Sequence, residues 1–312
     1  MIYTVTLNPA IDRTVLVDEI NEFDVTRVVK TVRDAAGKGI NVSKVITSLG
    51  GSTIATGFLA GVNGEFIQVE LMKKGIKEAF IFVGGETREN IKLIEKKSGK
   101  TLEINEAGPT IEPQYLERFI KTLDRSLKKD DILVLSGSVP GGIPVEVYQT
   151  LIERYHSLGI TTILDTSKEL LQKGILGKPT IIKPNRYELE LYSGKKLATD
   201  QDIVTEALKI CHQGIKEVIV TLGKDGAIYV SEERVFRVDS PRVVVQSSVG
   251  AGDSFVAGMA YALSEGYDTE KRLKYAASVA GACVMSEGTN PGKVTDVARL
   301  FDYVKIKEIE GK

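Results

Sequence analysis

The sequence contains no tryptophan, only two cysteines and only two histidines in 312 residues. Cys211 and Cys283 are far apart and lie inside helical patterns, which is typical of free buried thiols in a reducing compartment. His156 and His212 each precede a glycine at a predicted helix end, so we interpret them as partners of the helix dipole rather than as catalysts. Neither a disulfide framework nor a Cys/His metal centre is indicated.

Excess charge and long apolar runs are also missing. Lys and Arg number 41 against 42 Asp and Glu, a net charge of −1, which argues against a nucleic-acid or membrane surface. The chain lacks a run of about 18 apolar residues, and Met1 leads into a predicted strand without a basic or apolar leader. We therefore expect a cytoplasmic protein whose partners are small molecules, not nucleic acid or membrane.

Two common nucleotide-binding patterns do not occur. No Gly-x-Gly-x-x-Gly follows a predicted strand, and the Gly-Lys-Thr at 99–101 lacks the leading glycine of a P-loop. Because the complete P-loop pattern does not occur, we exclude a P-loop fold. A nucleotide-binding oxidoreductase stays open as an alternative class, and an absorbance change with NADH would detect it.

Strands and helices alternate through most of the chain, and 42% hydrophobic residues are enough for one large α/β core. The predicted strands are short, apolar and followed by polar or glycine residues, as in open sheets that bind ligands at their carboxyl edge. They cover residues 2–7, 53–58, 131–136, 161–165, 180–183, 217–221 and 243–246. The pattern predicts a mainly parallel sheet flanked by helices in a single domain over residues 1–312.

Two segments break this alternation. Residues 12–33 and 79–106, the latter with a turn at Ser98-Gly99-Lys100, read as successive strands without a long helix between them. They predict a small β-sheet that projects from the main body, with Arg27 on one of its strands. A plain edge hairpin is the alternative.

A loop of small residues follows the predicted strand at 243–246 and leads into a helix beginning at about Asp253. Gly250, Ala251 and Gly252 allow backbone N–H groups to converge at the positive end of this helix, which predicts an anion site. Asp253 has two interpretations, an N-cap of the helix or a base that accepts a proton from a substrate hydroxyl. Asp253 could also serve as both the N-cap and the base.

Residues Val249–Phe255 with Gly258 resemble the second signature of the ribokinase-like (PfkB) family of sugar kinases, and Ala35–Ser43 resembles its N-terminal glycine motif. The resemblance runs from Leu7 to about Gly292. It implies a ribokinase-like fold, ATP and Mg²⁺ as cofactors, and a small β-sheet that acts as a lid and supplies a homodimer contact. Asp253 would be the catalytic base, and the amides of Gly250, Ala251 and Gly252 would stabilise the transferring phosphoryl group.

The sugar site implied by the resemblance draws on several segments. Asp12 and Asn41 would hydrogen-bond sugar hydroxyls, and Gly37 and Gly39 would let the sugar approach the backbone. Basic side chains at motif-matched positions would bind an existing phosphate of the substrate. The candidate sugar-binding residues are Asp12, Arg27, Gly37, Lys38, Gly39, Asn41, Arg88, Ser136 and Ser138.

The nucleotide and metal sites are implied in the same way. Asn185 and Glu188 resemble the family's Asn-x-x-Glu motif, which would orient the waters of Mg²⁺, although the same spacing is that of an ordinary capping box. The candidate nucleotide-binding residues are Lys183, Asn185, Thr221, Gly223, Gly226, Ser247, Ser248 and Asn290.

Because phosphosugar kinases of this family bind the substrate's phosphate with basic residues at such lid positions, the resemblance implies a phosphorylated ketose as the substrate. The resemblance implies ATP-dependent phosphorylation of fructose 1-phosphate at its 6-hydroxyl, with tagatose 6-phosphate and fructose 6-phosphate as alternative substrates. A sugar-responsive binding protein that has lost catalysis is a further alternative, because it would keep Arg27 and Arg88 without needing Asp253 or Glu188.

Overall fold

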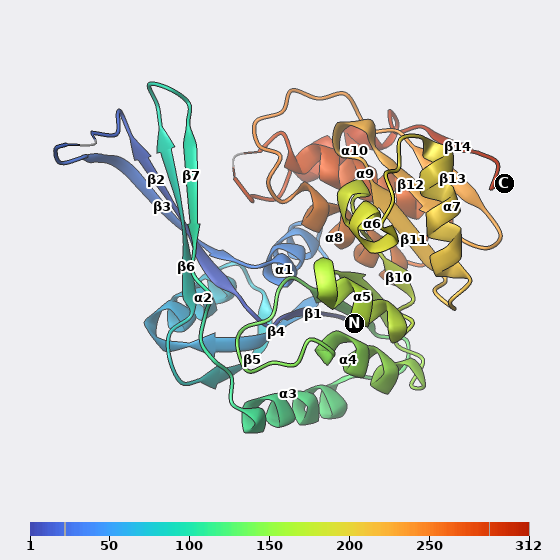
Figure 1. Ribbon diagram of the computed structural model, residues 1–312, viewed down its shortest axis with the longest axis horizontal. Coiled ribbons are helices and arrows are strands. Elements are labelled where there is room, and N and C mark those ends of the chain that lie inside the picture. The colour runs from blue at the N-terminus through green and yellow to red at the C-terminus, as the bar shows by residue number, and fades with distance from the viewer. Residues whose placement is uncertain (22, 287, 312) are drawn as a thin grey trace.

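The computed structural model describes residues 1–21, 23–286 and 288–311, and their strands form two separate sheets (Figure 1). In the large sheet, neighbouring strands run parallel from β11 to β5 and antiparallel from β11 to β14. Its strands lie in the order β14 (Ile306–Glu308), β13 (Val235–Val238), β12 (Ala227–Val230), β11 (Glu217–Thr221), β10 (Ile181–Ile182), β9 (Thr161–Asp165), β8 (Ile132–Ser136), β1 (Ile2–Thr6), β4 (Thr53–Ala60) and β5 (Lys77–Val83). The predicted mainly parallel sheet is confirmed.

Helices cover both faces of the large sheet. Side chains that alternate along β8 enter two different cores, Leu133 and Leu135 on one face and Ile132 and Val134 on the other. One face is covered by α3 (Pro113–Ser126), α4 (Val147–His156), α5 (Lys168–Leu176), α6 (Arg186–Ser193) and α7 (Asp200–Cys211). The other is covered by α1 (Lys38–Ser48), α8 (Ala251–Ser264), α9 (Thr269–Cys283) and α10 (Val294–Phe301), with α2 (Gly61–Lys73) beside β4 and β5. Burial on both faces explains why central strands such as β8 are largely apolar.

The small sheet consists of β3 (Val28–Ala36), β2 (Ala10–Val17), β6 (Arg88–Glu95) and β7 (Thr101–Asn105), in that order. It projects away from the large sheet (Figure 1). Ala10 pairs with Ala36 and Arg88 at its base, whereas Val17 pairs with Val28 and Glu95 towards its tip. At roughly 3.3 Å per residue the seven steps along β2 span about 23 Å.

The boundaries of this sheet differ from the predicted ones. Residues 79–83 belong to β5, the edge strand of the large sheet, because α2 returns the chain to pair with β4 in a regular parallel crossover. The second strand pair of the small sheet is therefore β6 with β7, within residues 88–105, and the predicted turn at Gly99 lies between the two strands. Glu22, within the predicted range 12–33, lies outside the described residues.

The predicted strand at residues 243–246 is wrong. This segment is an irregular connection in which Val244 and Val245 are 84% and 60% exposed. The amides of Gln246 and Ser247 donate to the carbonyl of Val284 at the end of α9 instead of pairing with a strand. The run of β-branched residues favours extended backbone, but a strand also needs a partner strand.

None of the helices in the described part of the chain combines the length and hydropathy needed to cross a lipid bilayer.

Candidate active site

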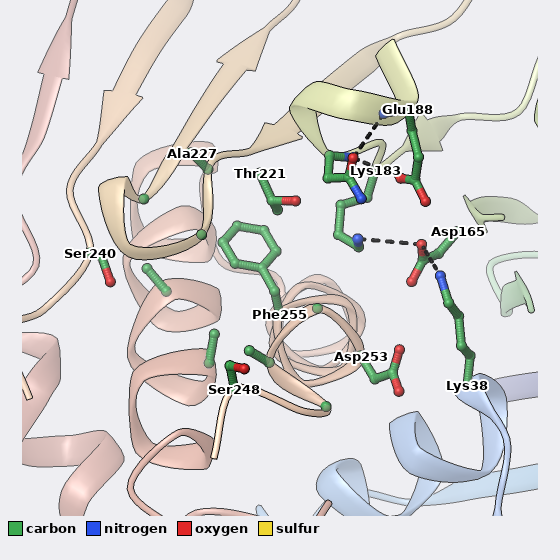
Figure 2. A pocket seen from close by; sticks show the side chains of 18 residues that line it. Lys38, Asp165, Lys183, Glu188, Thr221, Ala227, Ser240, Ser248, Asp253 and Phe255 are labelled. Carbon is green, nitrogen blue, oxygen red and sulfur yellow. Dashed lines mark hydrogen bonds and ion pairs between the residues drawn. The ribbon is translucent and has the colours of Figure 1, made fainter. Parts of the chain in front are cut away.

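Two cavities open at the carboxyl edge of the large sheet, and Lys38 lines both of them. The first, here called the α8 cavity, has a volume of about 360 Å³ and lies against the start of α8 (Figure 2). The second, here called the Arg88 cavity, has a volume of about 270 Å³ and is lined by Thr6, Asn8, Gly37, Lys38, Arg88, Gly137, Ser138, Thr166 and Ser167. A group held in one cavity therefore faces a group held in the other across a single lysine.

The start of α8 supplies the predicted cluster of backbone amides. Gly250 is the N-cap residue and has a φ of 82°, a left-handed conformation that glycine adopts without strain. Among the described side chains none caps this end, so the first N–H groups of α8 are free for a ligand. Ala251, Gly252 and Asp253 line the α8 cavity beside them.

Asp253 is the third residue of α8, so both the predicted helix start and the N-cap interpretation of this residue are wrong. The helix begins two residues earlier because the left-handed Gly250 provides the reversal that ends the loop. Asp253 is 8% exposed, and its Oδ2 accepts a hydrogen bond of 2.8 Å from Nδ2 of Asn41. Burial and the nearby carboxylate of Asp165 raise the pKa of Asp253 to about 6. Such a carboxyl ionises near neutrality, which suits a general base.

An ion-pair cluster lies beside Asp253, and its central residue, Asp165, was not among the predicted site residues. Oδ1 of Asp165 lies 3.0 Å from Nζ of Lys38 and 3.3 Å from Nζ of Lys183. Although burial alone would raise it, the ammonium groups of Lys183 and Lys38 lower the pKa of Asp165. A charged residue at the carboxyl end of a strand, directly after Ile163 and Leu164, was the feature that could have identified Asp165.

Asn185 and Glu188 line the α8 cavity and form a capping box at the start of α6. Oδ1 of Asn185 accepts from the amide of Glu188, and Oε2 of Glu188 accepts from the amide of Asn185, both at 2.8 Å. The capping-box interpretation is thus confirmed. Because the capping box uses only Oε2 of Glu188, Oε1 of Glu188 remains available to accept from another donor.

The other predicted nucleotide residues divide into two groups. Thr221, Gly223, Gly226 and Ser248 line the α8 cavity, as does Lys183, whereas Ser247 and Asn290 do not. The hydroxyl of Ser247 accepts from the amide of Val249, and the carbonyl of Asn290 accepts from the thiol of Cys283. Both of these residues shape the loops around α8 instead of facing the cavity.

Arg88 and Asn8 are hydrogen-bonded to each other in the lining of the Arg88 cavity. The guanidinium of Arg88 donates to the carbonyl of Asn8 through Nε at 3.2 Å and Nη2 at 3.1 Å. Asp12 lies next to this cavity on β2, where its Oδ1 accepts from Nδ2 of Asn90 at 2.9 Å, and burial raises its pKa. Asn8 and Thr166 were missed because each reads as an ordinary turn residue after a strand.

The predicted serine turn lies at the end of β8. Ser138 lines the Arg88 cavity, and its Oγ lies 3.5 Å from Nδ2 of Asn8. Ser136 is fully buried, and its Oγ has no hydrogen-bond partner among the described residues. An unpaired hydroxyl beside a polar cavity is an open position for a water or ligand.

Two of the predicted sugar residues occupy different positions from those expected. Gly39 faces β1: a Cβ there would lie 2.7 Å from the carbonyl oxygen of Val5, so this glycine serves helix–strand packing and not approach of a sugar. Gly37, with a φ of 125°, does line the Arg88 cavity. Arg27 is exposed and precedes β3 at the tip of the small sheet, so it is not on a strand.

The full chain matches known proteins closely. The model of the pfkB family carbohydrate kinases matches residues 5–296. A tagatose-6-phosphate kinase of Staphylococcus epidermidis is 34% identical over 312 residues, covering 99% of this chain and 100% of the relative. A 1-phosphofructokinase of Vibrio cholerae is 32% identical over 308 residues, covering 99% and 97%. The structure of phosphofructokinase-2 from Escherichia coli in complex with substrates and products is similar with a TM-score of 0.90 and 30% identity, covering 97% and 98%.

Proposed function

Because this chain belongs to the pfkB family of carbohydrate kinases and is a phosphosugar kinase, we propose that it transfers the γ-phosphoryl group of ATP to the 6-hydroxyl of fructose 1-phosphate. One observation carries the proposal: the Asp253 carboxyl and the free amides of α8 lie on one side of Lys38, with a cavity bearing Arg88 on the other. Nucleotide phosphates fit the first side and a phosphosugar the second.

Asp253 accepts the proton of the substrate hydroxyl, and its raised pKa keeps it both ionised and basic at neutral pH. The amides of Ala251 and Gly252, at the positive end of α8, face the charge that develops on the transferring phosphoryl group. Lys38, at the junction of the cavities, faces the same group. Positioning and electrostatics account for most of the catalysis of such reactions.

Asn185 and Glu188 are the residues that would hold Mg²⁺. Within the described residues there is no group of three His, Cys, Asp or Glu side chains that could cage a metal. A hydrated ion that touches Oε1 of Glu188 directly or through water fits this donor set, because Mg²⁺ keeps several waters and takes few protein ligands. When bound, Mg²⁺ would neutralise part of the negative charge of the phosphates.

Arg88 is the side chain best placed to bind the phosphate that the sugar already carries. It lines the cavity from the base of β6, and its guanidinium presents five donors. Nε and Nη2 donate to the carbonyl of Asn8, and Nη1 lies 3.4 Å from both Oδ1 of Asn90 and the carbonyl oxygen of Glu106. Asp12 and Asn90 lie together beside it and suit sugar hydroxyls. Asn41 acts through Asp253, since its amide is donated to that carboxylate.

Initial rates with fructose 1-phosphate, tagatose 6-phosphate and fructose 6-phosphate at equal ATP concentration test the substrate. We expect kcat/KM to favour fructose 1-phosphate by at least about tenfold, or about 1.4 kcal/mol. Tagatose 6-phosphate is the second candidate because a relative of that name is as similar as the phosphofructokinases. A tenfold preference for either alternative overturns the first choice.

We also propose that the small sheet is a lid and a homodimer contact. Arg27 precedes Val28 at the tip, seven residues along β2 from the base where Arg88 lies. Arg27 is therefore too far from the Arg88 cavity of its own subunit, and it can reach a sugar phosphate only if the Arg88 cavity of a second subunit faces this tip.

Complementation between two variants tests this arrangement. Arg27→Ala and Asp253→Asn should each be inactive as homodimers, while their mixture should regain about a quarter of the wild-type activity if Arg27 acts on the partner's cavity. Light scattering gives the assembly state beforehand. A monomer, or a mixture as inactive as its parts, contradicts the lid dimer while leaving the kinase proposal intact.

A further inference from the structure

The Asp165 carboxylate sits at the centre of the site, and the proposed kinase function gives it no role so far. We propose that Asp165, anchored by Lys183, is a positioning residue that holds the ammonium group of Lys38 at the junction of the two cavities. The inference rests on the proposed function, because Lys38 matters there only if a phosphoryl group crosses that junction.

The contacts of Asp165 define the arrangement. Its side chain is 1% exposed at the last residue of β9, and one oxygen, Oδ1, accepts from Nζ of Lys38 at 3.0 Å and lies 3.3 Å from Nζ of Lys183. The two lysines approach it from different segments, Lys38 from α1 and Lys183 from the end of β10 (Figure 2). Asp165 thus joins segments that are distant in sequence.

The two lysines differ in a way that assigns them different tasks. The side chain of Lys183 is 7% exposed, whereas that of Lys38 is 37% exposed and borders both cavities. Lys183 is therefore the fixed counter-charge that allows a carboxylate to be buried. Lys38 is the cation with room to move, and its long side chain would sample other rotamers without a partner.

A second feature indicates that Asp165 does more than balance charge. Its other oxygen, Oδ2, is buried and has no hydrogen-bond partner among the described residues. A carboxylate retained only for stability would be expected to use both oxygens, since an unpaired buried acceptor is costly. Asp165 lines the α8 cavity, so a ligand bound there can approach this carboxylate.

The charges around Asp253 provide a readout that a purely structural role would not change. Asp253 is faced by Asp165 from β9, by Lys38 and Asn41 from α1, by Lys183 from the end of β10 and by Cys283 from α9. Asp165 raises the pKa of Asp253, whereas Lys38 lowers it. Removing Asp165 should therefore shift the acid limb of the pH–rate profile to lower pH, and removing Lys38 should shift it to higher pH.

The experiment compares Asp165→Asn, Lys38→Gln and the double variant with wild-type protein, using fructose 1-phosphate and ATP over a pH series. Asp124→Asn is the matched control, because it removes a carboxylate from an ion pair with Arg154 far from both cavities. Thermal unfolding followed by circular dichroism verifies that each variant is folded.

We expect Asp165→Asn to lower kcat by roughly 10²-fold, as loss of a positioned charge does, while KM for the sugar changes less than about threefold. The acid limb should move to lower pH by roughly one unit in Asp165→Asn and to higher pH in Lys38→Gln. Because Asp165 acts through Lys38, the double variant should be no more than about threefold slower than Lys38→Gln. The control should match wild-type protein.

A kcat within threefold of wild-type for Asp165→Asn, or acid limbs that move in the same direction, overturns the inference. If Asp165→Asn does not fold, the double variant, which removes one charge of each sign, replaces it, and a tenfold loss beyond Lys38→Gln then contradicts the role. These outcomes are distinct from failure of the proposed function, in which wild-type protein itself would phosphorylate no phosphoketose.

Discussion

The amide of Asn41 donates a hydrogen bond of 2.8 Å to the carboxylate of Asp253, across 212 residues of sequence. This contact joins α1, which begins within the first glycine motif, to α8, which begins within the second. Because both residues are buried and each lies in the first turns of its helix, the carboxylate is held in one orientation at the junction of the cavities.

Replacing Asn41 by alanine should move the acid limb of the kcat profile to higher pH. The amide favours the charged form of Asp253, and hydrogen bonds to charged groups contribute about 1.5–3 kcal/mol, so the pKa should rise by roughly one to two units. A pH–rate profile measures this. Gln149→Ala is the control, since Gln149 donates the same type of bond to Glu153 on the surface. An unchanged acid limb would show that this amide does not tune the base.

Asp253→Asn should stabilise the protein at pH 8 while kcat falls by roughly 10²–10⁴-fold. The folded pKa of Asp253 is about 6, above its unfolded value near 3.9, so the folded state binds more protons between these values and loses stability as pH rises through them. Above pH 6 this penalty approaches about 3 kcal/mol, and below pH 4 it vanishes.

Urea unfolding at pH 4.5 and pH 8 measures the difference between this variant and wild-type protein. The gain in stability should be large at pH 8 and small at pH 4.5. Equal effects at both pH values would mean that Asp253 does not carry a raised pKa in the folded state.

The sequence was sufficient to predict the large sheet and the amide cluster, because both depend on local patterns. Apolar strands such as Ile132–Ser136 indicate burial on both faces. Gly250 and Gly252 indicate a loop whose backbone amides are little covered by side chains. Asp165 was not predicted, because its importance arises from Lys38 and Lys183, which only the fold brings to the same oxygen.

The errors have the same origin. Residues 243–246 have the side chains of a strand, but pairing depends on whether a neighbouring strand is present, which is a property of the whole sheet. Arg27 was expected on a strand, but β3 begins one residue later, at Val28. Gly39 looks like a ligand-approach glycine, and only its contact with β1 reveals a packing role.

Arg88→Met should raise KM for the phosphosugar by roughly 10–100-fold with a smaller change in kcat, because a charge-assisted contact to phosphate is lost. Initial rates at saturating ATP measure this. Arg125→Met, on the surface of α3, is the control for loss of a guanidinium. If KM for ATP rose instead of KM for the sugar, Arg88 would belong to the nucleotide side of the site.

Gly39→Ala should destabilise the protein by about 1–3 kcal/mol, the usual cost of overpacking a core. The added Cβ would lie 2.5 Å from Oγ1 of Thr6 and 2.7 Å from the carbonyl oxygen of Val5, and the backbone of β1 is fixed between β4 and β8. α1 must therefore move away from the sheet, which displaces Asn41 from Asp253 and lowers kcat as well. Gly84→Ala is the control, because a Cβ there meets no atom within 4 Å. Thermal unfolding and kcat measured on the same samples test both effects, and a Gly39→Ala protein as stable and active as the Gly84→Ala control would refute this packing role.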